Sequence, residues 1–258
     1  MLRPRIIPCL LLINNGLYKT KNFKDPKYVG DPLNAVKIFN EKEVDELIIL
    51  DIYATAEKRE PNYSLIRKIA NESRMPICYG GGINNINQIT KIISLGIEKI
   101  SISSAIFTNP NLIKEARNKV GSQSIVAVMD IKKSSFFGEQ KVFINNSKLN
   151  TKMSPTKFAK YVTDLGAGEI LVNSIERDGT LKNYDIPLAR EIVCATNIPI
   201  TMLGGAGSLE DIKTLIDSIG LIGCAAGSLF VFKGKYRAVL IQYPNPLEKE
   251  NLFSSKYN

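Results

Sequence analysis

The sequence predicts a single α/β domain in which eight parallel strands close into a (β/α)₈ barrel. Three observations favour it: a length of 258 residues, short apolar runs that recur, and amphipathic segments between those runs. Barrels of this class commonly use about 250 residues for one domain. The length and the alternation together favour a closed barrel over an open, doubly wound sheet.

The expected strands are apolar on both faces, which is typical of parallel strands that are covered on both sides. In chain order they read IIPCLLL, LIILDIY, PICYGGG, KISISSA, IVAVMDI, EILVNSI, PITMLGG and LIGCAAG. The expected helices carry apolar residues at spacings of three and four, and several end at a glycine. The clearest are PLNAVKIFNEK, NINQITKIISLG, NPNLIKEARNKVG, SPTKFAKYVTDLG and SLEDIKTLIDS.

The chain also resembles itself across its midpoint. Residues 75–107 and 198–230 share one order of features: a proline, paired glycines, a helix, a strand, small residues and a phenylalanine. Such self-similarity indicates two half-barrels related by duplication within one domain.

We expect the barrel to span residues 1–245. The segment 132–152, after the fifth strand, is too long for a simple connection and predicts a small hairpin on the rim. The sequence KYRAVLIQYP predicts a final helix that ends at Pro244, and residues 246–258 are expected to be a C-terminal tail.

Composition excludes several function classes. The 34 Lys and Arg against 25 Asp and Glu give a net charge of +9, which favours anionic partners. The basic residues are scattered without an arginine-rich run, so a phosphorylated small molecule is favoured over nucleic acid. Because the chain has no histidine, it holds no Ser–His or Cys–His nucleophile pair, no histidine metal ligand and no histidine base.

The four cysteines are far apart and form neither a metal-binding spacing nor a disulfide framework, so we expect reduced core thiols. We expect no metal and no cofactor. No apolar run reaches the roughly 18 residues of a membrane span, and the N-terminus lacks a signal cleavage site. A cytoplasmic location with no membrane contact is the resulting expectation.

In a barrel of this kind, the carboxyl ends of the strands surround the functional mouth. Glycine-rich and serine-bearing turns are expected there in two matching sets, one after strands three and four and one after strands seven and eight. A single glycine-rich turn is commonly only a tight turn. The duplicated pairs favour two phosphate sites, because glycine lets backbone N–H groups approach an anion. A ligand phosphorylated at both ends would suit them.

Four charges of alternating sign stand at or just before the starts of four strands. They are Arg5, Glu46, Lys99 and Glu169. Any one of them would ordinarily be a surface ion pair. Four together around one axis predict a polar gate at the N-terminal mouth of the barrel.

At this point a family resemblance is visible. The blocks RIIPCL, DELIILDI, YGGGI, GSQSIVAVMD, GAGEIL, ERDGT, GGAG and GSLF occur in order and resemble the cyclase subunit of imidazole glycerol phosphate synthase over about residues 1–232. The resemblance implies a TIM barrel, a lyase that receives ammonia from a glutaminase docked at its N-terminal face. It also implies a ribulosyl substrate, phosphorylated at both ends, at the opposite face.

The resemblance assigns roles residue by residue. It implies that the four charges form the ammonia gate and that Gln123 lies near the glutaminase interface. Asp130 matches a catalytic aspartate, Lys19 matches a mobile-loop lysine that assists closure, and Asp51 is a further catalytic candidate; on its own, Lys19 would be a solvated loop lysine. The phosphate-binding candidates are Gly81, Gly82, Ser103, Ser104, Asp178, Gly179, Gly204, Gly205, Gly227 and Ser228.

The sequence departs from the family at one catalytic position. The family has a second aspartate at the end of the first strand, and here Leu11 takes its place. A leucine cannot transfer a proton, and the loss of a general acid–base group typically costs about 10²- to 10⁴-fold in rate. The nearby Asn14 and Asn15 can hydrogen-bond but cannot supply a proton at neutral pH. Cyclisation is therefore expected to be weak or absent.

Leu11 and the divergent C-terminal sequence together resemble a branch described as glycosyl amidation-associated proteins. That resemblance implies a subunit that supplies ammonia, with a glutaminase and an N-acetyl sugar amidotransferase, for conversion of an acetamido to an acetamidino group on a surface-polysaccharide or flagellin sugar. This is the leading interpretation. The alternatives are a cyclase subunit of histidine biosynthesis and a non-catalytic barrel that only scaffolds a glutaminase.

Overall fold

The computed structural model describes residues 3–134 and 138–253, and these residues contain the predicted barrel. Its eight parallel strands are β1 (Arg5–Ile13), β4 (Leu47–Asp51), β5 (Ile77–Gly80), β6 (Lys99–Ile102), β7 (Ile125–Lys133), β10 (Glu169–Ser174), β11 (Ile200–Leu203) and β12 (Gly223–Ala226). They pair in this order, and β12 pairs with β1, so no edge is left open. The prediction of a closed (β/α)₈ barrel is confirmed.

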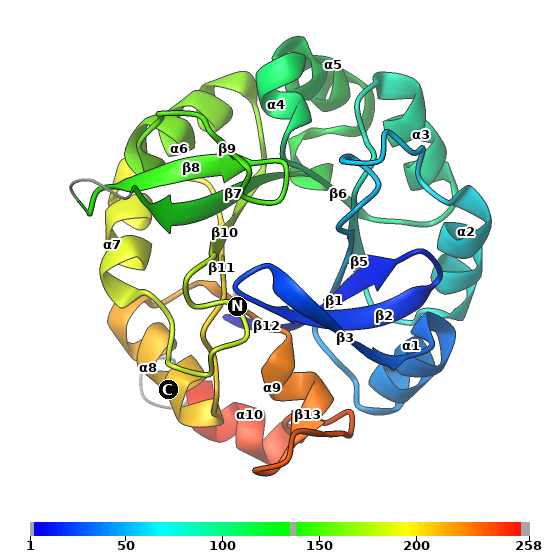
Figure 1. The fold of residues 1–258 in the computed structure, drawn as a ribbon, viewed down its shortest axis with the longest axis vertical. Helices are drawn as coiled ribbons and strands as arrows, with labels where there is room; N and C mark the ends of the chain where they lie inside the picture. The colour runs from blue at the N-terminus through cyan, green and yellow to red at the C-terminus, as the bar shows by residue number, and fades with distance from the viewer. Residues whose placement is uncertain (1–2, 135–137, 254–258) are drawn as a thin grey trace.

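Helices surround the strands on the outside (Figure 1). The longer ones are α1 (Pro32–Glu41), α2 (Tyr63–Glu72), α3 (Ile86–Ser94), α5 (Asn111–Val120), α6 (Pro155–Leu165), α7 (Ile186–Ala195) and α8 (Leu209–Ile219). Short helical turns are α4 (Ala105–Thr108), α9 (Ser228–Val231) and the 3₁₀ turn Ser122–Ser124. The two helices of the sequence repeat, α3 and α8, both begin with a reciprocal capping box, which satisfies backbone donors at the helix start.

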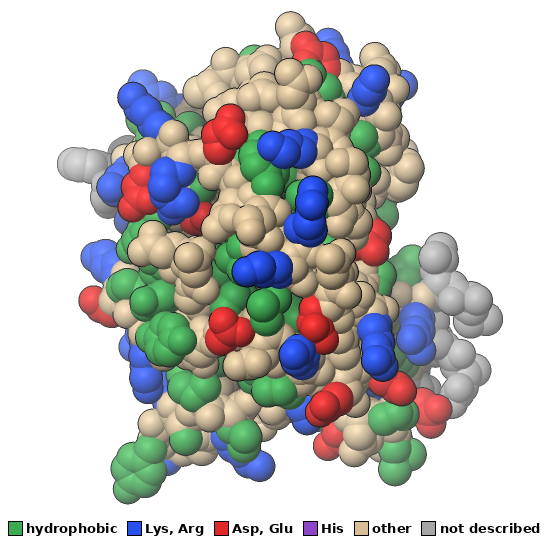
Figure 2. Space-filling view, turned by 90° about the vertical axis from the view of Figure 1, so that its right-hand side faces the viewer, with side chains coloured by type: hydrophobic (Ala, Val, Ile, Leu, Met, Phe, Trp, Pro, Cys, Tyr) green, Lys and Arg blue, Asp and Glu red, His purple; other side chains and the backbone are tan. Residues whose placement is uncertain are grey.

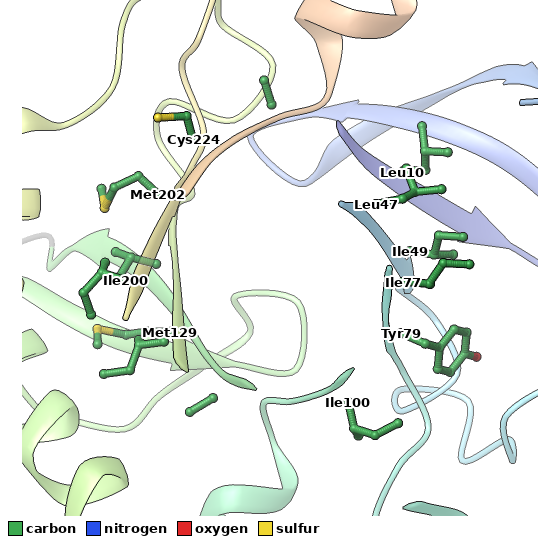
Figure 3. Close-up of a cluster of buried hydrophobic side chains, with 14 of the residues drawn as sticks. Leu10, Leu47, Ile49, Ile77, Tyr79, Ile100, Met129, Ile200, Met202 and Cys224 are labelled. Atoms are coloured by element: carbon green, nitrogen blue, oxygen red, sulfur yellow. The ribbon is translucent and has the colours of Figure 1, made fainter. Parts of the chain in front are cut away.

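Residues of each strand alternate between two cores. In β1, Ile6, Leu10 and Leu12 belong to the outer core between strands and helices, whereas Ile7, Cys9 and Leu11 point into the barrel. Figure 3 shows outer-core side chains such as Leu10 and Tyr79 directed away from the barrel axis. The inner core is completed by Ile48, Cys78, Val126, Val128, Leu171, Leu203 and Ala225. Apolar and small side chains therefore pack the barrel interior.

Two hairpins extend the barrel at its carboxyl mouth. The first βα connection is a hairpin of β2 (Gly16–Lys21) and β3 (Lys24–Gly30), and β2 pairs with β1. In the segment 132–152, the long β7 continues into β8 (Gln140–Ile144) and β9 (Leu149–Asn150), which fold back antiparallel. Residues 135–137 of that segment lie outside the described residues. The two hairpins lie over different sides of the mouth (Figure 1).

The prediction of a helix at KYRAVLIQYP is wrong. The segment contains β14 (Ala238–Val239), which pairs with β13 (Phe232–Lys233) across a turn. Its backbone donors are used elsewhere: the N–H groups of Leu240 and Gln242 donate to the carbonyls of Val231 and Phe230, so no helical ladder forms.

The final helix lies later in the chain than predicted. It is α10 (Pro246–Phe253), inside the segment expected to be a tail, and it packs on α8. Leu252 and Phe253 are buried, which explains why these residues are ordered. Among the described residues, every helix is too short or too polar to traverse a lipid bilayer.

Candidate functional site

A cavity of about 310 Å³ lies at the carboxyl mouth of the barrel. Its walls come from strand ends and from both hairpins: Lys19 and Phe23 from the first, and Asn145, Asn146 and Lys148 from the second. Asn146 donates through its amide to the carbonyl of Ile52 at 2.7 Å, which holds the second hairpin against the mouth. The position agrees with the rule that such barrels work at this end.

Asp130 is half-buried at the end of β7 and lines the cavity. Burial raises the pKa of Asp130 to about 7; the hydrogen bond from Asn173 opposes this shift, and the nearby charge of Asp178 adds to it. The amide Nδ2 of Asn173 lies 3.1 Å from Oδ1 of Asp130. Asp130 can therefore both accept and donate a proton near neutral pH, as a general acid–base group requires.

Leu11 lies across from Asp130 in the inner core, where it is 8% exposed. It packs with Leu203 and Val128, and Leu50 of the paired strand β4 joins them, so this half of the cavity floor is apolar. The exposed Asn14 and Asn15 lie in the β1–β2 turn and are not among the cavity-lining residues. Among the described residues, no second acid faces Asp130 from the position of Leu11.

Asp51 lines the cavity, but its carboxylate is already engaged. Its Oδ1 accepts from the backbone N–H of Ala54 at 3.1 Å, and both terminal nitrogens of Arg59 lie 3.3 Å from its oxygens. The Asp51 carboxylate therefore caps the turn at Ala54, and the two terminal nitrogens of Arg59 bind it side by side. Asp51 thus holds the turn after β4 together with Arg59, a residue that the sequence analysis did not single out.

Lys19 projects from β2 into the mouth and is only 4% exposed. Its Nζ donates to the carbonyl of Cys9 at 3.4 Å and occupies the space in which a side chain on Gly227 would begin. Among the described residues, no carboxylate pairs with it within salt-bridge distance. The interpretation as a solvated loop lysine is therefore wrong, and a buried ammonium with a single backbone acceptor suits an anionic ligand.

The first set of phosphate candidates lies on one wall of the cavity. Gly81, Gly82, Ser103 and Ser104 all line it. Gly81 and Gly82 have φ values of +117° and +72°, and a side chain on either would meet backbone atoms of the β4–α2 segment. Glycine is thus required for the close approach of these two strand ends, which also leaves backbone N–H groups uncovered.

The second set lines an adjoining cleft, formed by Gly179, Gly204, Gly205, Gly227 and Ser228. Asp178 lines both spaces, so the second cradle opens beside the main cavity.

The Asp178 carboxylate is a poor phosphate ligand, because like charges repel. It accepts instead from the hydroxyl of Thr20 at 2.9 Å and from the N–H of Phe23 at 3.4 Å, and so fastens the first hairpin to the barrel.

The four predicted gate residues form a closed ring at the opposite mouth. Arg5 pairs with Glu46, and with Glu169 at 2.8 Å; Lys99 pairs with Glu46 at 2.9 Å and Glu169 at 2.8 Å. Thr201, which the sequence analysis did not single out, donates its hydroxyl to Glu169 at 2.5 Å. The alternating signs let every charge have two opposite neighbours.

The ring is strongly coupled. Burial opposes the charged form of Lys99, but Glu169 and Glu46 nevertheless raise its pKa. Burial likewise opposes ionisation of Glu169, while Arg5 and Lys99 lower its pKa. The ion pairs of the ring therefore favour the charged forms of Lys99 and Glu169. Gln123 is exposed in the 3₁₀ turn that precedes β7, on the same side of the barrel as the ring.

Two buried polar atoms near the cavity are unpaired within the part of the chain that the structure describes. They are Ser101 Oγ and Asn173 Oδ1, and both residues line the cavity. Their inward positions follow from the period of two along β6 and β10, so the strand pattern held the signal. Unsatisfied buried polar atoms commonly mark a place where a ligand or water binds.

The face of the molecule drawn in Figure 2 does not show a single basic stripe. On the face in Figure 2, Lys and Arg side chains are interspersed with Asp and Glu. This distribution agrees with the expectation that the net charge of +9 belongs to a mixed surface.

Comparison with known proteins agrees with the geometry. A family model described as "Histidine biosynthesis protein" matches residues 5–237. A Leptospira borgpetersenii protein named "Putative imidazole glycerol phosphate synthase subunit HisF" is 54% identical over 98% of this chain and 100% of its own length. The Hydrogenobaculum protein named "Imidazole glycerol phosphate synthase subunit HisF" is 41% identical over 90% of this chain and 92% of its own.

The similarity spans the strands that carry both the charged ring and the cavity. By these matches, the chain belongs to the histidine biosynthesis protein family, among the relatives of the HisF cyclase subunit of imidazole glycerol phosphate synthase.

Proposed function

We propose that this chain is a cyclase-type subunit of an imidazole glycerol phosphate synthase-like complex. In this proposal a glutaminase docks at the N-terminal face, near the ring and Gln123, and ammonia passes through the barrel. A phosphorylated ligand binds at the carboxyl mouth. The observation that carries the proposal is a closed ring of charges at one mouth and, at the other, a cavity lined by Lys19 and Asp130.

The ring and the packed interior define how ammonia would move. Arg5 and Leu11 are separated by six residues of β1, or about 20 Å of strand. Apolar side chains such as Ile7 and Cys9 fill the axis between them. Neutral ammonia tolerates such surroundings better than ammonium, but the ring must open before it can enter, and partner docking is the event that would open it.

The cavity supplies the remaining parts. The two glycine cradles suit the two phosphate groups of a ribulosyl substrate, Lys19 adds a buried positive charge, and Asp130 transfers a proton. With Leu11 in place of a second acid, Asp130 would have to serve every proton-transfer step alone. Cyclisation by this chain is thus expected to be slow.

A second candidate function rests on the same leucine. Since Leu11, Leu203 and Val128 make half of the cavity floor apolar, the barrel would keep its ammonia supply while losing cyclase chemistry. It would then deliver ammonia for the acetamido-to-acetamidino conversion of a sugar, together with a glutaminase and an N-acetyl sugar amidotransferase.

An assay with ammonium and the doubly phosphorylated ribulosyl substrate tests these proposals. We compare the wild type with Leu11→Asp, and use Leu11→Asn as the matched control because it has the shape of aspartate without its proton. Under the first proposal the wild type shows slow turnover, Leu11→Asp gains about 10²-fold, and Leu11→Asn gains nothing.

Other outcomes separate the candidates. If neither the wild type nor Leu11→Asp binds or converts the ribulosyl substrate, the cyclase-type proposal is rejected and sugar amidation is favoured. Equal turnover by all three variants would show that Asp130 alone suffices. If the chain raises glutaminase turnover without any phosphorylated ligand and accepts no substrate, it acts as a scaffold.

A further inference from the structure

The C-terminal hairpin brings a cation to the second phosphate cradle. Arg237, in the turn between β13 and β14, directs its guanidinium back at the barrel, where Nη2 lies 3.3 Å from the hydroxyl of Ser228. Ser228 is 5% exposed and lines the cleft with Gly227, Gly204 and Gly205. This hairpin occupies the segment in which sequence reasoning expected a helix, so Arg237 was not among the predicted site residues.

The guanidinium of Arg237 is held in place by more than one contact. It stacks on the ring of Phe232 with its central carbon 4.6 Å from the ring centroid. Phe232 is itself buried, with 7% exposure. An arginine that is stacked and hydrogen-bonded loses less rotamer freedom when it binds an anion than a free surface arginine does. The contact with a neutral hydroxyl leaves other guanidinium N–H groups to bind an acceptor.

A second cation lies at the same turn. The ammonium of Lys19, buried and without a carboxylate partner among the described residues, lies against Gly227, the neighbour of Ser228. Lys19 belongs to the β2–β3 hairpin and Arg237 to the β13–β14 hairpin. Two positive groups from different hairpins thus lie at one backbone turn, while Asp178, which lines the same cleft, is hydrogen-bonded to Thr20.

The two hairpins also touch one another. Lys27 of β3 donates to the carbonyl of Arg237 at 3.4 Å, and its ammonium lies 5.2 Å from the centroid of Phe232. Both of these contacts involve an exposed lysine, so they are weak by themselves.

We propose that Arg237 is a further ligand-binding residue, which together with Lys19 holds a phosphoryl group at the second cradle, and that the bound phosphoryl group fastens the β2–β3 hairpin to the β13–β14 hairpin. The inference rests on the proposed function only in requiring a phosphorylated ligand. Because a charge-assisted hydrogen bond is stronger than one between neutral groups, the loss of Arg237 is expected to weaken phosphate binding about tenfold or more.

The test uses the full chain and inorganic phosphate as the probe, with chloride at matched ionic strength. Affinity is measured by calorimetry for the wild type, Arg237→Gln, Arg237→Lys and the control Lys235→Gln, which removes the same charge from an exposed position of the same turn. Hydrogen exchange of residues 16–30 and 227–239 shows where phosphate binds and whether it tightens the hairpins.

We expect phosphate to slow exchange in both hairpins of the wild type and of Lys235→Gln. Arg237→Gln should lose about tenfold in affinity and the protection of both hairpins, and Arg237→Lys, which keeps the charge, should lose less. The inference is overturned if Arg237→Gln binds as the wild type does, if Lys235→Gln loses as much, or if phosphate protects neither hairpin. If Arg237→Gln already exchanges faster in the β13–β14 hairpin before phosphate is added, the comparison uses Arg237→Lys instead. The inference is then rejected if Arg237→Lys loses as much phosphate affinity as Arg237→Gln.

Failure of this inference is distinguishable from failure of the proposed function. The proposed function is tested by ammonium-dependent turnover and glutaminase docking of the wild type. The present inference is tested by the difference in phosphate affinity between Arg237→Gln and Lys235→Gln. A chain that binds phosphate through Arg237 but accepts no ammonia rejects the proposed function and retains the inference. A chain that cyclises the ribulosyl substrate but binds phosphate equally well without Arg237 retains the proposed function and rejects the inference.

Discussion

At the scale of single residues, Leu11 places an apolar side chain in the cavity at the carboxyl mouth. Leu11 lies at an inward position of β1, at the place where the family resemblance requires an acid, and it packs against other apolar side chains. Asp130 is left with Asn173 as its hydrogen-bond partner and with a pKa that burial raises to about 7. Under the proposed function, Asp130 alone would therefore take the place of an acid–base pair.

The raised pKa of Asp130 predicts a pH-dependent stability difference. Since the folded state holds this proton more tightly than the unfolded state, wild-type stability falls as the pH rises from about 4, the usual pKa of an aspartate, towards 7. Asp130→Asn removes this dependence. The free energy of unfolding of Asp130→Asn, measured relative to the wild type, should therefore increase by about 2 kcal/mol between pH 4 and pH 8. This value is smaller than the full pKa shift would give, because Asp130 is only half-buried.

Urea unfolding at several pH values measures this difference. A constant difference between Asp130→Asn and the wild type across that range would mean that the carboxyl ionises as an ordinary aspartate does. Asp31→Asn, at the exposed N-cap of α1, serves as the control for an aspartate-to-asparagine substitution at an exposed site.

At the scale of elements, the hairpins and the last helix determine how the site is enclosed. The β2–β3 hairpin supplies Lys19 and is anchored by Asp178, and the β8–β9 hairpin supplies Asn146. On the outside, α10 closes the structure between α8 and the β4 entrance, where Lys249 pairs with Asp45 at 3.2 Å. The segment expected to be a tail is therefore a packed element.

The packing of α10 predicts a contrast within one helix. Leu252 is 6% exposed and Leu247 is 67% exposed. Leu252→Ala should lower the free energy of unfolding by about 2 kcal/mol through lost burial and a cavity. Leu247→Ala should change it by less than about 0.5 kcal/mol. Thermal and urea unfolding measure both, and equal effects of the two substitutions would show that α10 does not dock as described.

For the whole molecule, the barrel has a ring of ion pairs at its N-terminal mouth and a cavity at its carboxyl mouth. The N-terminal ring is closed by four charges that neutralise one another, while the carboxyl mouth combines glycine cradles with a buried lysine. The parallel strands produce this polarity, because every strand starts at the ring and ends at the cavity. Under the proposed function, the partner that supplies ammonia and the ligand that consumes it would therefore bind at separate faces.

The closed ring predicts that its lysine is stabilising. Lys99→Met leaves Glu46 and Glu169 with a single shared cation, so the free energy of unfolding at pH 7 should fall by about 2 kcal/mol. Lys114→Met, at an exposed position of α5, is the charge-matched control and should stay within about 0.5 kcal/mol of the wild type. A Lys99→Met chain as stable as the wild type would show that the ring contributes nothing to folding.

The sequence by itself determined the barrel, its strand order and the positions of the gate and cradle residues. Those features depend on local periodicity and on glycines whose φ values only glycine adopts readily, so they are encoded within short segments. It also located Leu11, because an inward strand position is defined by its neighbours two residues away.

Only the tertiary structure decided the rest. Sequence periodicity could not show that KYRAVLIQYP forms no helix, since the N–H groups of Leu240 and Gln242 donate to the carbonyls of Val231 and Phe230 instead of to their own segment. It likewise could not reveal that Lys19 is buried against Gly227 or that Asp178 accepts from Thr20, because these contacts join distant parts of the chain. The contact of Arg237 with Ser228, nine residues away, depends on the turn between β13 and β14 folding back on α9.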